Sequence, residues 1–105
     1  MRLSSILRQS DGPRLHWWCP GCGQPHCVQV GDGPGPRWGW NKDVDHPTFT
    51  PSVAVTWTDP DTKRVEEVCH SFVKEGAMQF LGDCTHELAG QTVPIPAWPS
   101  DWEGV

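Results

Sequence analysis

The feature that most constrains the fold of this chain is the pair of cysteines in Cys19-Pro20-Gly21-Cys22-Gly23. Two thiolates three positions apart on a tight turn can bind one metal ion, and the proline and glycines let backbone N–H groups approach the sulfurs. Redox dithiols share this spacing, but they normally open a helix, and Gly23-Gln24-Pro25 is a poor helix start. The motif therefore predicts a zinc-ribbon-like knuckle that supplies half of a tetrahedral site.

The composition shows why such a domain needs a metal. The chain has 105 residues, which is one domain, yet Leu, Ile, Val and Phe together number only 20, while Gly and Pro number 11 each. Seven Trp residues make up part of this thin core. Small domains with few aliphatic residues usually rely on disulfides or a metal. The predicted fold class is a small, β-rich, mainly antiparallel α+β domain over residues 1–105, stapled by Zn²⁺.

Charge and cysteine usage exclude several classes of protein. There is no apolar run long enough to cross a membrane, and the N-terminus lacks the pattern of a signal peptide. A cytoplasmic location is therefore expected, where cysteines are more often metal ligands than disulfides, and the odd number of five agrees with this. The net charge of −5 offers no basic face for a phosphate backbone. We expect no membrane partner and no duplex nucleic acid as partner.

Alternation of apolar and polar residues predicts five strands, and the segments between them are irregular. The expected strands are 15–18, 27–30, 52–58, 65–73 and 77–81, with a tight hairpin turn at 75–76. A short helical turn is expected at 85–90. The remaining segments are a lead-in at 1–13, a long Gly/Pro/Trp loop at 31–51 and an irregular tail at 94–105.

The other half of the metal site must come from the second half of the chain. If residues 74 and 77 pair, Cys84 lies close to Cys69 at the open end of that hairpin. The predicted ligands are thus Cys19, Cys22, Cys69 and Cys84; the alternates are His70, His86 and His26. Cys27 is expected to be a small buried residue outside the site.

Three aromatic residues in or next to the long loop allow two interpretations. Trp38, Trp40 and Phe49 can form a slot that stacks on a base or nucleotide, or can fold inward and serve as core. The sequence favours the core interpretation, and the slot remains an alternative.

Several motifs in the same order carry a resemblance to a known family. In the first half they are Cys19-Pro20-Gly21-Cys22, Gly-Pro-Gly-Pro-Arg-Trp at 33–38, Trp40-Asn41, Pro47-Thr48-Phe49 and Pro51-Ser52. In the second half they are Cys69-His70-Ser71-Phe72-Val73, Gly76, Phe80-Leu81, Asp83-Cys84-Thr85-His86 and 88–93. Over residues 15–98 the chain resembles a family of small phage and prophage proteins without assigned function, often labelled "ammonia monooxygenase". The resemblance implies a phage-associated, zinc-binding accessory protein, and no reaction.

The known zinc-enzyme signatures are incomplete here. The deaminase pattern needs His-x-Glu ahead of its cysteine pair, and His86-Glu87 lacks the second His of a His-Glu-x-x-His helix. The sequence therefore favours a non-enzymatic, phage-encoded protein that binds a host protein and inhibits a defence or regulatory factor. One alternative is a zinc-dependent hydrolase or nucleotide-acting enzyme with Asp83 or Glu87 as general base. Another alternative is a nucleotide-sequestering module.

Overall fold

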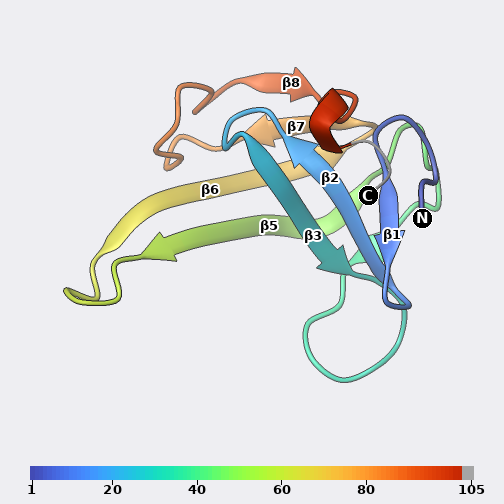
Figure 1. Ribbon diagram of the computed structural model, residues 1–105, viewed down its shortest axis with the longest axis horizontal. Helices are drawn as coiled ribbons and strands as arrows, with labels where there is room; N and C mark the ends of the chain where they lie inside the picture. Colours follow the sequence, from blue (N-terminus) through green and yellow to red (C-terminus); the bar gives the residue numbers. More distant parts are fainter. Residues whose placement is uncertain (103–105) are drawn as a thin grey trace.

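The computed structural model describes residues 1–102, which form two antiparallel β-sheets (Figure 1). The first sheet has the order β1 (Arg8–Ser10), β2 (Arg14–Cys19) and β3 (Gln24–Gln29). The second has the order β4 (Gly39–Trp40), β5 (Phe49–Thr58), β6 (Val65–Lys74), β7 (Ala77–Phe80) and β8 (Thr92–Pro94). Within the described residues the only helix is the 3₁₀ turn η1 (Ser100–Trp102), and no helix there is long and apolar enough to span a bilayer.

The strand expectations of the second sheet are confirmed. Lys74 pairs with Ala77, and Glu75 and Gly76 both have positive φ, as a two-residue hairpin turn of the I′ type requires. Along β6, Cys69, Ser71 and Val73 are buried, while the alternate positions are partly exposed. The period of two thus sends one face of β6 into the core and the other toward solvent.

The core lies between the two sheets. Trp17 of β2 is fully buried and stacks on Phe49 of β5, with ring centroids 5.2 Å apart. Leu15 and Val28 extend the first sheet's contribution, and the largest buried side chains of the second include Phe80. Burial of each large apolar side chain stabilises the fold by about 1.5–3 kcal/mol. Two aromatic rings thus occupy the centre of a domain that has few aliphatic residues.

Trp38, Trp40 and Phe49 pack inward, as the core interpretation predicted, and so does Trp98 of the tail. Phe49 is 1% exposed, and Trp38 and Trp40 pack against the core as partly buried residues. In the tail, Trp98 is buried and its Nε1–H donates to the Ile6 carbonyl at 2.9 Å. Trp98 thereby ties its part of the tail to the N-terminal segment.

Three local expectations are corrected by the structure. Residues 85–90 form turns instead of a helical turn, because their hydrogen bonds, such as Ala89 N–H to His86 O, span three residues and are too few to nucleate a helix. The lead-in contains strand β1, and β4 lies within the long loop. Cys27 is exposed, because the alternation along β3 turns His26 and Val28 toward the core.

Candidate metal centre and catalytic triad

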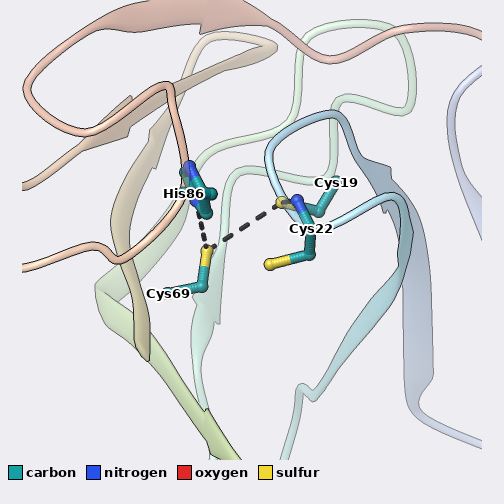
Figure 2. Close-up of side chains that lie close together, drawn as sticks. All are labelled: Cys19, Cys22, Cys69 and His86. Carbon is teal, nitrogen blue, oxygen red and sulfur yellow. Dashed lines mark hydrogen bonds between the residues drawn. The ribbon is translucent and has the colours of Figure 1, made fainter. Parts of the chain in front are cut away.

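Four side chains converge where the tip of the β2–β3 hairpin meets the second sheet (Figure 2). Cys19 ends β2, Cys22 lies in the turn after it, Cys69 lies on β6, and His86 follows in the loop after β7. Their ligand atoms all lie within 4.8 Å of one another. Cys19 Sγ is 3.9 Å from Cys69 Sγ, and His86 Nε2 is 3.4 Å from Cys69 Sγ. A set of three sulfurs and one imidazole at this spacing can hold a tetrahedral metal ion.

Local structure fixes both the knuckle and the histidine. The N–H of Cys22 donates to Cys19 Sγ at 3.4 Å, and Gly23 N–H closes the turn on the Cys19 carbonyl at 2.9 Å. The His86 ring packs edge-on against Phe80, with centroids 4.6 Å apart. Any Cβ at position 21 would collide with that ring, so glycine is required there for His86 to approach the cysteines. The donor set is thus preorganised for one ion.

The thiol pKa values differ across the cluster, and each difference has a physical cause. Cys19 accepts a hydrogen bond from the Cys69 thiol, and this bond, with a smaller effect of the nearby His26, outweighs burial and lowers the pKa of Cys19 to about 4. Donation to Cys19, together with burial, raises the pKa of Cys69. Burial and the charge of Cys19 raise the pKa of Cys22 to about 12. Without a cation the site therefore favours a single thiolate, and a divalent ion would offset the cost of ionising the other two.

The position of Cys84 differs from the sequence prediction. It was expected as the fourth ligand, but His86, an alternate, occupies that position in the cluster. Cys84 Sγ instead accepts the His70 N–H and donates to the His70 carbonyl, both at 3.2 Å. His26, another alternate, lies outside the four and is buried between Trp17 and Trp57, at centroid distances of 6.1 and 6.4 Å.

His70, the third alternate, belongs to a different arrangement. Its Nε2 is 3.0 Å from Ser52 Oγ, and its Nδ1 is 3.2 Å from Asp83 Oδ2. Ser52, His70 and Asp83 thus form an unbroken hydrogen-bonded chain of hydroxyl, imidazole and carboxylate. This is the constellation of a Ser-His-Asp triad, which is recognised by geometry and occurs in several chain orders. The His70 side chain is 28% exposed and that of Asp83 is 58% exposed, so solvent reaches the chain.

Ser52 lies at the edge of a β-bulge, two positions before Ala54, which pairs with His70. Phe49 pairs with Val73 and Val53 pairs with Ser71, so β5 advances four residues while β6 advances two. The extra residues include Ser52, and such bulges re-aim side chains, often beside active sites. The Ser52 carbonyl accepts the indole N–H of Trp38 at 3.3 Å, which holds this irregular segment in place.

The metal cluster and the triad share the same two segments. Cys69 directly precedes His70 on β6, and Asp83 is three residues before His86. An ion that binds Cys69 and His86 therefore also restricts how far His70 can move from Asp83.

The sequence points to His70 and Asp83 in other roles, and it does not mark Ser52 as a functional residue. A signal was present, because the predicted strands 52–58 and 65–73, joined by a short turn, pair so that Ser52 falls near His70. Alternation places Ser52 and His70 on one face of the sheet, but it does not mark a strand serine as a nucleophile.

Comparison with known families bears directly on this geometry. Residues 3–81 match the family model described as "Bacterial ubiquitination-like system serine protease (BubE)". The chain belongs to the BubE family. The matched range contains Ser52 and His70, and Asp83 lies two residues beyond its end. No curated protein and no solved structure matches the chain.

Proposed function

We propose that this BubE-family chain is a serine hydrolase of a bacterial ubiquitination-like system and that Ser52 is its nucleophile. The observation that carries the proposal is the hydrogen-bonded chain Ser52–His70–Asp83, at 3.0 and 3.2 Å. A family described as serine proteases gives independent support.

The geometry accounts for both halves of an acyl transfer. His70 Nε2 takes the proton of Ser52 as Oγ attacks a substrate carbonyl, and Asp83 accepts the Nδ1–H and stabilises the imidazolium. The tetrahedral intermediate collapses when the bond to the leaving nitrogen or oxygen breaks, and that atom takes the proton from Nε2. Water then loses a proton to Nε2 and attacks the acyl-enzyme; as the acyl–Oγ bond breaks, Nε2 returns the proton to Oγ, which releases the carboxylic acid and restores Ser52 and neutral His70.

We assign a structural role to the metal and propose that it is zinc in a zinc-ribbon-like knuckle. Cys19, Cys22 and Cys69 with His86 make a Cys₃His set, which is typical of structural zinc. Four protein ligands complete a tetrahedron and leave no position for a catalytic water. This favours the serine mechanism over the zinc-dependent hydrolase that the sequence offered as an alternative.

A fluorophosphonate probe, which phosphonylates activated serines, tests the nucleophile. The wild-type protein should gain one adduct at Ser52, located by peptide mass spectrometry, and Ser52→Ala should gain none. The chain offers a matched control, because Ser10 Oγ also contacts a histidine, His16 Nε2. Within residues 1–102 no carboxylate hydrogen-bonds His16, so Ser10→Ala should label like the wild type.

Labelling that persists in Ser52→Ala, or that disappears in Ser10→Ala, would contradict the assignment. Binding to a host protein, the function that the sequence favoured, stays a separate prediction. The Ser52→Ala variant, which should fold without being active, can be used to test host-protein binding apart from hydrolysis.

A further inference from the structure

A groove opens on the solvent-facing side of the second sheet, where β5 meets the β6–β7 hairpin. Its volume is about 480 Å³, within the ~300–1,000 Å³ of ordinary ligand sites. Its lining comes from the start of β5, the end of β6 and one flanking residue of each, namely Thr48, Phe49, Thr50, Pro51, Phe72, Lys74 and Glu75.

The groove adjoins the triad on both strands. Pro51 directly precedes Ser52 on β5. Phe72 is two positions after His70 on β6, so the two side chains lie on the same face of the sheet. A substrate whose carbonyl carbon lies at Ser52 Oγ therefore has this groove beside its reacting centre.

The chemistry of the groove is apolar with a neutral rim. Phe72 is partly exposed and Pro51 is exposed, so both offer apolar surface to a ligand. The Lys74 ammonium lies 5.2 Å from the centre of the Phe72 ring, and Glu75 follows with the opposite charge. The rim therefore favours neither an anion nor a cation, and the apolar walls decide what binds.

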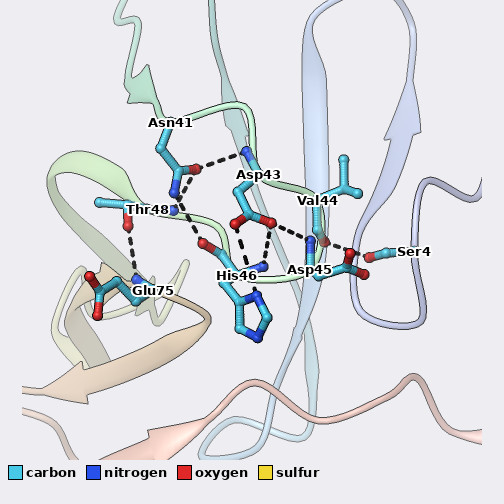
Figure 3. Close-up of polar contacts among 8 residues, drawn as sticks. All are labelled: Ser4, Asn41, Asp43, Val44, Asp45, His46, Thr48 and Glu75. Carbon is cyan, nitrogen blue, oxygen red and sulfur yellow. Dashed lines mark hydrogen bonds and ion pairs between the residues drawn. The ribbon is translucent and has the colours of Figure 1, made fainter.

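One wall of the groove is held rigid by the loop before β5 (Figure 3). Thr48 Oγ1 accepts the Glu75 N–H at 2.8 Å, which ties the loop to the hairpin. The Asn41 side chain accepts the Thr48 N–H at 3.0 Å, and Asp43 accepts the N–H groups of Asp45 and His46 at 3.0 Å each. A preformed wall lowers the entropic cost of binding.

We propose that this groove binds an apolar group on the acyl half of the substrate, next to the carbonyl that Ser52 attacks. The inference rests on the proposed serine mechanism and adds a substrate class to it. The acyl half stays bonded to Ser52 after the first step, whereas the other half departs. A groove that begins at the residue before the nucleophile is therefore placed to hold the half that stays.

Hydrolysis of 4-nitrophenyl acetate, butyrate and hexanoate tests this, because the leaving group is constant and only the acyl chain grows. In the wild type, kcat/KM should rise about threefold to fourfold for each methylene that enters the groove. Phe72→Ser removes the apolar wall and should flatten this rise, and Phe72→Leu should give an intermediate slope. Val65→Ser makes a similar apolar-to-serine change on β6 at an exposed site outside the groove, and it should keep the wild-type slope.

The outcomes separate the two proposals. Ester hydrolysis no faster than that of Ser52→Ala would overturn the serine mechanism and the groove with it. Hydrolysis that depends on Ser52 but shows no rise with chain length would overturn the groove alone. An unchanged slope in Phe72→Leu, with a melting temperature near that of the wild type, would also overturn it, even if Phe72→Ser does not fold.

Discussion

At the scale of single residues, Asp83 has the most testable role. Its carboxylate holds His70 Nδ1 at 3.2 Å but is 58% exposed, so water screens its charge. Loss of a buried triad aspartate lowers kcat by about 10⁴-fold. We expect Asp83→Asn to lower kcat by less, about 10- to 100-fold, with little change in KM or melting temperature.

Ester kinetics of Asp83→Asn beside Glu87→Gln measure this effect. Glu87 is an exposed acid in the same segment, so its variant controls for the lost charge alone. Equal losses in the two variants would show that Asp83 acts only through net charge.

Cys84 gives a second prediction at this scale. Because its Sγ contacts both backbone groups of His70, Cys84 positions the histidine and is no part of the four-ligand cluster. Cys84→Ala should keep the metal content of the wild type and lower kcat about fivefold, with KM unchanged, for a loss of about 1 kcal/mol of positioning. Cys84→Ser should recover part of the loss, because a hydroxyl can make the same two hydrogen bonds.

Metal analysis and kinetics of the same two preparations give the measurement. If Cys84→Ala binds less metal than the wild type, Cys84 is a metal ligand and the prediction is wrong.

At the scale of elements, the metal should control the triad, because β6 and the segment 82–86 supply residues to both. Removal of the ion would free Cys69 from His86 and allow His70 and Asp83 to separate. We expect the downfield NMR signal of the His70 Nδ1 proton, and the rate of fluorophosphonate labelling, to fall together as a chelator strips the metal. Both should return on addition of Zn²⁺. Labelling at the full rate in stripped protein would contradict this coupling.

The sequence predicts the regular strands better than it predicts which side chains the irregular segments turn toward the site. Strands β5, β6 and β7 follow from alternation, and the hairpin at Glu75-Gly76 follows from local turn chemistry, whereas the short β4 and β8 were not predicted. The side chain that faces the metal does not follow from either, because Cys84 and His86 both lie in an irregular segment with no period to orient them. Ser52 was missed for a different reason, since alternation places it on the face of His70 but gives no sign that a strand serine is a nucleophile.

At the scale of the whole molecule, the metal cluster joins the two sheets. Cys19 and Cys22 lie at the tip of the first sheet's hairpin, while Cys69 belongs to the second sheet, 50 residues after Cys19. Beyond this junction the sheets are held by a core with few aliphatic residues around Trp17 and Phe49. Structural zinc in small domains contributes on the order of 10 kcal/mol, as much as the entire stability of many domains.

The loss of one ligand should therefore unfold the protein instead of merely inactivating it. Cys19→Ser should be unfolded or insoluble, whereas Cys27→Ser changes an exposed cysteine outside the cluster and should melt like the wild type. One equivalent of zinc per chain is expected, and thermal melts with and without a strong chelator measure its contribution. If stripped protein keeps its melting temperature, the core alone holds the two sheets together, and the metal has no structural role.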